Sequence, residues 1–403
     1  MPENHKTPKE FAVAKMQSIQ EEMKDLDEIV RLCLVALYAK GHVLLEGNPG
    51  LGKTALVNTL GKTLAFEAGR IQFTPDLMPS DITGTMMPAE SNGQGFRLEF
   101  QEGPIFTSLL LADEINRATP KTQSAMLEAM AEEQVTVLGT QWALPKPFMV
   151  LATQNPIDHE GTYTLPEAQT DRFMFKLLMP TPKATTLSKI MEKEANRLAR
   201  SAQEMGKEQK NMKMETGSVV DAIKEQQKSA RERCYAYRSS IGSIDLIPSS
   251  QRHILNLVLA TNQQFDELDS LNKANKSPKL DIRSIRTLTE KVMRYGLGPR
   301  AATALMLGAK AWSFFFASPE NEQADGFDLA RVILPALRHR LRLGYDWVDK
   351  YRPQSEPEDV DENALLDELI AELAILTAPN LDGYQNTFER EMKRVLSKEY
   401  GGA

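Results

Sequence analysis

The chain has 403 residues, of which 26% are charged, and a formal net charge of −7. This length allows two or three domains with a sizeable core, and the acidic balance argues against general nucleic-acid binding. The two cysteines, Cys33 and Cys234, lie far apart without a CxxC pattern, which argues against a disulfide framework or a zinc site. The polar segment Met1–Glu10 and the lack of a long apolar run predict neither a signal peptide nor a membrane span. The expected location is the cytoplasm.

The first predicted elements are a flexible tail over residues 1–10 and a helix from Phe11 to Lys40, where apolar residues recur near helical spacing. The helix ends at Gly41. The apolar run Val43-Leu44-Leu45 that follows predicts a buried strand.

A glycine-rich loop follows this strand and precedes a predicted helix, Ala55 to Leu64. Glycines let the backbone N–H groups curl around a phosphate, and the helix adds its positive dipole end. In such a loop Lys53 reaches the terminal phosphates, and the Thr54 hydroxyl binds Mg²⁺. The plain alternative is a structural glycine turn. The predicted nucleotide-binding residues are Gly47, Asn48, Pro49, Gly50, Leu51, Gly52, Lys53, Thr54 and Ala55.

Four further apolar runs predict strands that are buried on both faces, and their alternation with helices predicts a parallel α/β sheet. Two other segments, at about residues 85–100 and 134–147, have turn residues between alternating apolar positions and predict β-hairpins. The four predicted strands are Arg70–Phe73, Leu109–Ala112, Phe148–Thr153 and Phe173–Leu178.

Two of these strands are followed by polar residues that could take part in catalysis. Asp113 would hold the Mg²⁺ shell, and Glu114 could polarise a water for attack on a γ-phosphate. Taken alone, this acidic pair also fits a turn or a helix start. After the next strand, Asn155 offers an amide that could orient the attacking water, although an Asn-Pro turn explains it equally well.

Pro180-Thr181-Pro182 marks a boundary, because neither proline can continue a strand ladder. The rest of the chain is predicted to be helical. Residues 201–233 are mostly charged or Gln-rich and predict an exposed insertion, either a surface decoration or an arm that docks a partner. Further helices are predicted over 250–265, 282–295, 299–316 and 328–343, and a last amphipathic element over 365–376.

Taken together, the motifs resemble those of the AAA+ ATPases, and specifically of the MoxR family. The most specific stretches are residues 72–84, 112–123 and 152–156, with Asp171-Arg172-Phe173. The resemblance implies an α/β fold: a P-loop AAA+ core (11–181) with a parallel five-stranded sheet and helices on both faces, followed by an α-helical lid (182–348). Residues 349–403 are expected to form an acidic linker and a C-terminal helical extension.

The resemblance also implies roles for single residues. Residues 47–54 would be Walker A, Asp113 and Glu114 Walker B, and Asn155 sensor 1. Arg172 corresponds to the arginine finger that reaches into a neighbouring subunit's ATP, its plain alternative being a solvated surface arginine. Arg300, after Gly298-Pro299, matches sensor 2 and is expected at a helix start, facing the phosphates from above.

Three further motifs are less informative. Asn116-Arg117 is either an intersubunit contact or a polar pair at a helix start. The pair His339-Arg340 resembles the closing motif of the family and has no chemistry that the sequence can assign. Apolar residues of the two hairpins, such as Leu98 and Trp142, either pack against the ring or contact a polypeptide.

By this resemblance the chain would form a homo-oligomeric ring, typically a hexamer, that uses ATP and Mg²⁺ to remodel, mature or assemble a protein client. The typical partner carries a von Willebrand factor A domain, and neither a nucleic-acid nor a membrane partner is expected. The competing class is a nucleic-acid motor or restriction-type translocase of the same AAA+ branch, which the uncharged hairpin tips disfavour. A scaffold without turnover is disfavoured by the presence of Glu114, Asn155, Arg172 and Arg300.

Overall fold

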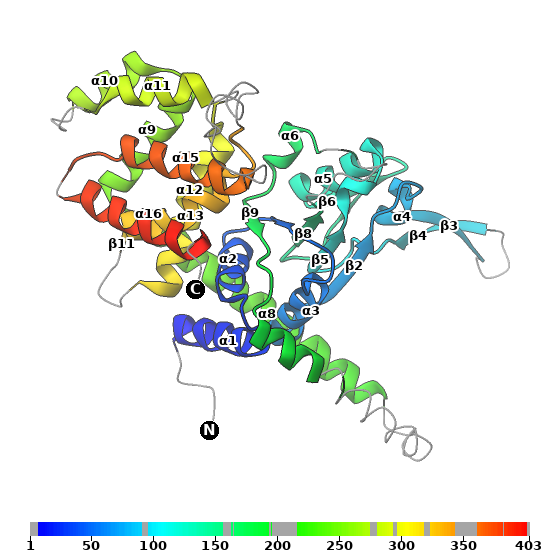
Figure 1. Cartoon of the computed structure of the whole chain (residues 1–403). Helices are drawn as coiled ribbons and strands as arrows, with labels where there is room; N and C mark the ends of the chain where they lie inside the picture. The colour runs from blue at the N-terminus through cyan, green and yellow to red at the C-terminus, as the bar shows by residue number, and fades with distance from the viewer. Residues whose placement is uncertain are drawn as a thin grey trace.

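A parallel sheet organises the first half of the chain in this computed structural model, which describes residues 7–90, 96–155, 163, 165–192, 195, 216–274, 280–292, 296–317, 323–342, 361–381 and 383–400 (Figure 1). The strand order is β2-β5-β8-β1-β9, and all neighbouring strands are parallel. The predicted five-stranded α/β core is therefore confirmed. The strands are β1 (Val43–Glu46), β2 (Ala68–Gln72), β5 (Leu109–Asp113), β8 (Met149–Gln154) and β9 (Phe175–Leu178).

Helices cover both faces of this sheet. Successive side chains of a strand point to opposite faces, so Val43 and Leu45 pack in one apolar cluster and Leu44 in another. The first cluster includes residues of α2 and α3, and the second includes residues of α5. The helices of this half are α1 (Pro8–Glu22), α2 (Asp27–Tyr38), α3 (Lys53–Leu64), α4 (Pro79–Thr83), α5 (Pro120–Glu132) and α6 (Glu167–Thr170), with a 3₁₀ turn, η1 (Ile115–Arg117).

The single helix expected from Phe11 to Lys40 is wrong, because the structure has two helices there. They are separated at Asp25, whose φ of 65° lies in the left-handed region and cannot continue a helix. The bend lets buried Ile19 on α1 and buried Val30 on α2 join the same apolar cluster. α1 starts at Pro8 with a capping box between Thr7 and Glu10, inside the range expected to be a tail.

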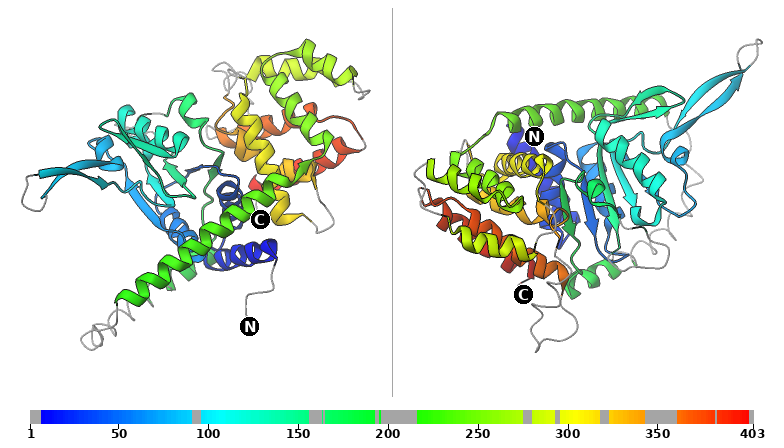
Figure 2. Two further views of the ribbon diagram at one scale, coloured as in Figure 1. Left: turned by 180° about the vertical axis from the view of Figure 1, so that it is seen from behind. Right: turned by 90° about the horizontal axis from the view of Figure 1, so that it is seen from above.

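Both predicted hairpins are present and antiparallel. β3 (Gly84–Glu90) pairs with β4 (Phe96–Glu102), and this hairpin projects from the body (Figure 2). β6 (Gln134–Val137) pairs with β7 (Thr140–Ala143). Phe100 and Trp142 join the two hairpins, because their rings stack with centroids 4.3 Å apart. The tip of the first hairpin, residues 91–95, lies outside the described residues.

The second half of the chain is a helical lid. The prediction for α12 matches its bounds, and the helix predicted over 250–265 corresponds to α9, which ends earlier, at Thr261, while Phe265 already begins α10. α15 and α16, which we expected as an extension beyond the lid, pack on α13 and share its core. The elements are α9 (Pro248–Thr261), α10 (Phe265–Ala274), α11 (Ile282–Val292), α12 (Pro299–Phe316), α13 (Gly326–Leu337), α15 (Glu362–Thr377), α16 (Tyr384–Tyr400) and the short parallel pair β10 (Asp245–Leu246) and β11 (Gln323–Ala324).

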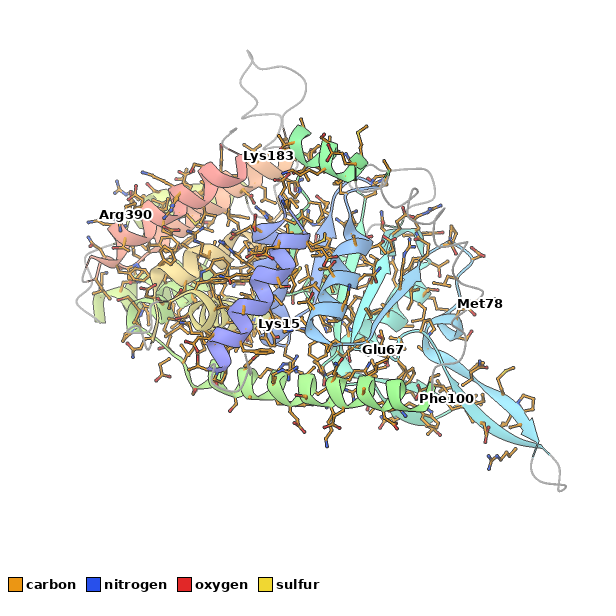
Figure 3. All side chains as sticks on the ribbon, turned by 90° about the horizontal axis from the view of Figure 1, so that it is seen from below. Lys15, Glu67, Met78, Phe100, Lys183 and Arg390 are labelled. Carbon is orange, nitrogen blue, oxygen red and sulfur yellow. The ribbon has the colours of Figure 1, made fainter. Side chains whose placement is uncertain are left out.

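Part of the predicted charged insertion belongs to a long helix, α8 (Thr216–Ser243), while residues 201–215 lie outside the described residues. Residues 221–226 of α8 are exposed. Further along, Ala230, Cys234, Tyr237 and Ile241 recur at helical spacing and are buried. α8 packs against α1, α2 and α12, and Figures 2 and 3 show it crossing near one end of α1. Met78 and Phe100 lie near the root of the β3–β4 hairpin (Figure 3).

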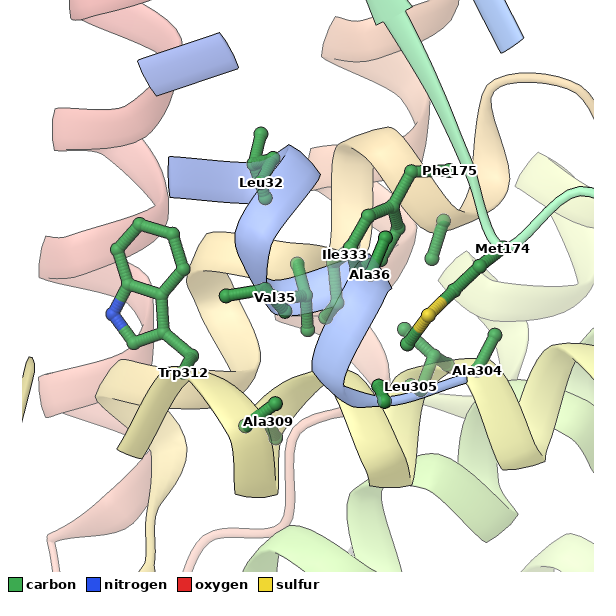
Figure 4. Packing of buried hydrophobic residues seen from close by; sticks show 14 of the residues in the cluster. Leu32, Val35, Ala36, Met174, Phe175, Ala304, Leu305, Ala309, Trp312 and Ile333 are labelled. Atoms are coloured by element: carbon green, nitrogen blue, oxygen red, sulfur yellow. The ribbon is translucent and has the colours of Figure 1, made fainter. Parts of the chain in front are cut away.

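The lid and the sheet share one continuous apolar core. Val35 and Ala36 of α2 pack with Leu305 and Ala309 of α12 in this cluster, and Phe175 of β9 and Ile333 of α13 belong to it as well (Figure 4). Burying a large apolar side chain contributes about 1.5–3 kcal/mol, so this seam holds α12 firmly against α2. Within the described ranges, no helix is long and apolar enough to cross a bilayer.

Candidate active site

The glycine-rich loop connects the carboxyl end of β1 to the start of α3. Gly50 and Gly52 have φ values of +85° and +83°. These values lie in the left-handed region, which L side chains rarely adopt, so glycine is needed at both positions. Gly52 is the N-cap of α3, and Leu56 donates its backbone N–H to the Gly52 carbonyl. The loop is therefore shaped to present backbone N–H groups and a helix N-terminus to an anion.

Lys53 begins α3 and lies within electrostatic range of the acidic side chains at the end of β5. Its Nζ donates to the Gly47 carbonyl. Burial lowers the pKa of Lys53, whereas the charges of Asp113, Glu114 and Glu46 act in the opposite direction. These residues, which are far apart in the sequence, are thus brought within electrostatic range of one another.

Asp113 ends β5 and has a partner on each carboxylate oxygen. The Thr153 hydroxyl donates to Oδ1 at 2.7 Å, and Arg70 Nη2 lies 2.7 Å from Oδ2. The Thr153 hydroxyl also accepts the backbone N–H of Glu114 at 2.8 Å. Mg²⁺ in nucleotide sites is held by one or two protein oxygens together with phosphates and waters. One carboxylate at Asp113 and one hydroxyl at Thr54 fit that requirement.

Glu114 has a backbone conformation that is uncommon for its residue type. Its φ is 57°, in the left-handed region, and such positions cost on the order of 1–3 kcal/mol and cluster at functional sites. Its Oε2 accepts from Gln72 Nε2 at 3.1 Å and from Arg117 Nη1 at 2.8 Å. Arg117 is therefore engaged within its own subunit, and the buried Oδ1 of Asn116 has no hydrogen-bond donor among the described residues.

Asn155 directly follows β8, which lies between β1 and β5 in the sheet. Because the carboxyl ends of parallel strands meet at one edge, Asn155 lies beside the glycine-rich loop and Asp113. Sequence reasoning missed several residues of this edge: Arg70, Gln72, Thr153 and the buried Glu46, which contacts Lys176, Gln154 and Asn363. Each is an ordinary polar residue of its strand, and the strand register alone brings them to the site.

Arg172 lies at the opposite edge of the sheet from the loop of its own subunit. It precedes β9, whose first residue pairs with Val43 at the start of β1. The four residues of β1 separate the two edges by about 10–13 Å, at ~3.3 Å per residue. The Nη1 of Arg172 donates to the Leu127 carbonyl of α5, and its buried Nε has no acceptor in the described part of the chain.

Arg300 lies in the first turn of α12, as predicted, and near Arg172 rather than near the glycine-rich loop of its own subunit, while its role toward the phosphates stays a prediction. Its side chain is 56% exposed, and its Nη1 lies 3.7 Å from Asp171 Oδ2. The apolar seam between α12 and α2 fixes this position, which the local Pro-Arg motif does not reveal. Arg172 and Arg300 line a cavity of about 440 Å³ that reaches Gly41 and His42, just before β1.

The pair His339-Arg340 follows α13 and holds the segment that carries Arg172. Arg340 Nε donates to Asp171 Oδ1 at 2.8 Å, and its Nη2 donates to the Phe173 carbonyl at 2.7 Å. His339 Nε2 lies 2.9 Å from the same carbonyl. Burial lowers the pKa of His339 well below its ordinary value, so the ring is neutral and its Nε2–H donates. The structure thus gives this pair a role in anchoring residues 171–174 to the lid.

Comparisons with known proteins agree with this geometry. The model of the ATPase family associated with various cellular activities (AAA) matches residues 42–175, and that of the AAA lid domain matches residues 285–368. The lid match extends beyond residue 348, in agreement with the packing of α15 on α13.

The most informative relatives cover different shares of the chain. Chaperone MoxR1 of Mycobacterium tuberculosis is 34% identical over 320 residues, which are 79% of this chain and 72% of that protein. YeaC of Bacillus subtilis is 53% identical over 167 residues, or 41% of this chain and 51% of YeaC, so that match spans about half of the relative. A crystal structure described as an ATPase from Cytophaga hutchinsonii has a TM-score of 0.66 and 30% identity, and the match covers 90% of this chain and 95% of that one. The chain therefore belongs to the MoxR family of AAA+ ATPases.

Proposed function

We propose that this chain hydrolyses ATP at sites shared between neighbouring subunits of a ring, and that it uses hydrolysis to remodel a protein client. One observation carries the proposal. The glycine-rich loop, Asp113 and Glu114 lie at the carboxyl edge of the sheet, whereas Arg172 and Arg300 lie at the amino edge. A complete set of phosphate-binding and charge-neutralising groups therefore requires two subunits.

The carboxyl edge supplies one half of each shared site. Lys53 would neutralise the terminal phosphates, while Thr54 and Asp113 would hold Mg²⁺, whose positive charge stabilises the transferring phosphoryl group. Glu114 would polarise the attacking water, and Asn155 would orient it. The contacts of Glu114 with Gln72 and Arg117 keep its carboxylate near this edge.

The amino edge supplies the other half. Its cavity is lined by four cationic side chains and two carboxylates, an excess of positive charge that suits a phosphate. Arg172 would stabilise charge on the γ-phosphoryl oxygens of the neighbour's ATP, a role worth about 10³–10⁵ in turnover where an arginine finger acts. Arg300, from the same cavity, would bind the same phosphates. A hexameric ring is the assembly that the family resemblance favours.

A protein is the client that the surface favours. Leu98 and Leu138 on the two hairpins are 61% and 79% exposed, which suits contact with a polypeptide. Phe100 and Trp142 stack on each other instead, so they connect the hairpins. A partner with a von Willebrand factor A domain is proposed from the family resemblance, and the chaperone description of a relative supports this class over a nucleic-acid motor.

Mixing two impaired variants tests the shared site. Lys53→Ala should abolish ATP binding in its own subunit, and Arg172→Ala should lower turnover at the neighbour by about 10³-fold or more while leaving a measurable residual rate. Mixed rings contain junctions with an intact Lys53 on one side and an intact Arg172 on the other, so ATPase activity should return on mixing. Each variant mixed with itself is the control. Absence of recovery, despite co-assembly seen by size-exclusion chromatography of differently tagged subunits, would contradict the proposal.

A further inference from the structure

We infer that Arg340 of the lid positions the arginine finger Arg172 of the same subunit. This inference rests on the proposed function, in which Arg172 acts on a neighbour's ATP. It assigns a role in turnover to a residue that touches neither the glycine-rich loop nor the acidic pair.

The hydrogen bonds of Arg340 converge on the residues that flank Arg172. Besides its bonds to Asp171 Oδ1 and the Phe173 carbonyl, Nη1 donates to the Met174 carbonyl at 3.1 Å, and Nη2 to the Asp171 carbonyl at 3.2 Å. The Arg340 side chain is 4% exposed. A buried guanidinium with several fixed acceptors holds them in one geometry. The backbone on both sides of Arg172 is therefore fixed from the lid.

Asp171 connects the lid to both arginines of the cavity. Its Oδ1 accepts from Arg340, and its Oδ2 faces Arg300 at 3.7 Å. His339 adds a further bond to the Phe173 carbonyl, and the Thr170 hydroxyl donates to the His339 carbonyl at 3.4 Å. Residues before and after Arg172 are thus hydrogen-bonded to the two residues His339 and Arg340 that follow α13.

These contacts make the position of the finger depend on the lid. α13 also packs on α12 and β9, so the lid element that bonds residues 171–174 is itself held in place. A shift of about 1 Å in a positioning element can cost about 100-fold in rate. Loss of the Arg340 contacts should therefore lower turnover at the neighbouring site without weakening nucleotide binding in the same subunit.

The test is a double-mutant comparison of Arg340→Lys and Arg172→Ala in the assembled protein. Lysine keeps the positive charge but lacks the planar fork that reaches several acceptors. We expect Arg340→Lys to lower kcat by about 10- to 100-fold with little change in KM. We also expect the double variant to be no slower than Arg172→Ala, because the finger that Arg340 positions is already absent.

Arg338→Lys is the matched control. Arg338 lies two residues earlier and forms a buried ion pair with Asp367. The change Arg338→Lys should therefore lower the stability of the fold as strongly as Arg340→Lys does. Because Asp367 belongs to α15 and not to the segment of the finger, the fold-changes in kcat of Arg338→Lys and Arg172→Ala should multiply in the double variant. Where Arg340→Lys does not fold, Asp171→Asn removes the carboxylate that Arg340 binds and should show the same non-additive loss.

The outcomes separate the two hypotheses. Wild-type turnover by Arg172→Ala would contradict the shared site itself. A slow Arg172→Ala combined with a multiplicative effect of Arg340→Lys would leave the shared site intact and overturn the positioning role. A raised KM for Arg340→Lys at unchanged kcat would overturn it as well.

Discussion

Asp113 has a neighbour that competes with a metal ion for its charge. Arg70 binds Oδ2 from the adjacent strand β2, with its own side chain half exposed. The Thr153 hydroxyl occupies Oδ1 and connects Asp113 to the backbone of Glu114. Arg70 and Thr153, which lie outside the glycine-rich loop and the acidic pair, therefore determine how much negative charge the Asp113 carboxylate offers to Mg²⁺.

Arg70→Ala should strengthen the response to Mg²⁺. Removing the guanidinium leaves Asp113 unneutralised, and an exposed pair of this kind is worth about 0.2–1 kcal/mol. The Mg²⁺ concentration for half-maximal ATPase activity should then fall by up to about fivefold. A magnesium titration of the ATPase rate measures this effect. Arg97→Ala, which removes an arginine paired with Glu99 on the β3–β4 hairpin, is the control. An unchanged or raised requirement in Arg70→Ala would contradict the competition.

Local motifs predicted some residues of the site and missed others for a physical reason. Lys53 and Glu114 belong to short patterns in which neighbouring residues carry the signal. Arg70 and Thr153 reach the site through strand register, which depends on pairing between distant segments. Arg300 was recognised by its motif, but its place at the amino edge depends on how α12 packs against α2.

At the scale of elements, α9 is tied to the last two helices through buried polar groups. His253 Nε2 lies 2.8 Å from the Ala374 carbonyl of α15, and its Nδ1 lies 3.1 Å from the Tyr384 hydroxyl of α16. Asn256 Nδ2 donates to the Thr377 carbonyl at 2.9 Å. Burial lowers the pKa of His253 to about 3, so the folded lid keeps this ring neutral.

His253 should make the lid less stable in acid. Its folded pKa is about 3, below the ordinary value of 6.5. The unfolded chain therefore binds a proton below about pH 6.5 that the folded chain does not bind, so stability is lost as the pH falls through this window. At pH 5 the loss from one such group is about 2 kcal/mol. Thermal unfolding at pH 7.5 and pH 5 should show a smaller fall for His253→Gln than for the wild type.

Asn256→Ala is the control for this pH effect, since it weakens the same contact between helices without removing a titrating group. It should lower the unfolding midpoint about equally at both pH values. Asp328, whose pKa burial raises to about 7, contributes with the opposite sign, but it is present in all three proteins and cancels in the comparison. An equal fall for wild type and His253→Gln would contradict the role of His253.

Element boundaries were predictable where the pattern is local. The range of α12 followed from Gly298-Pro299 at its start and from its apolar content. The break between α1 and α2 was missed, because no glycine or proline marks it in the sequence and Asp25 adopts the left-handed conformation instead. A helical extension was predicted for the region of α16, but its packing on α13 was not, since its residues are largely polar and the contact depends on a few buried groups such as Phe388.

At the scale of the whole molecule, the two halves of the proposed active site lie at opposite edges of the sheet. The carboxyl edge carries the glycine-rich loop, the amino edge carries Arg172 and Arg300, and the β3–β4 hairpin projects to one side (Figure 2). The sequence predicted that Arg172 acts on a neighbouring subunit, whereas the place of Arg172 and Arg300 at the amino edge required the structure. The surface that a client meets is set by the hairpins and by a net charge of −7.

The client class can be decided by measuring the ATPase rate with and without DNA at low salt. The chain is acidic, and the tip of the β6–β7 hairpin, Leu138-Gly139, carries no cation. Phosphate contacts supply most of non-specific DNA affinity and depend on basic side chains. We therefore expect no stimulation by single- or double-stranded DNA, while a protein partner that binds one nucleotide state preferentially should change the rate. A several-fold stimulation by DNA that disappears on adding salt would contradict the protein-remodelling proposal and favour a nucleic-acid motor.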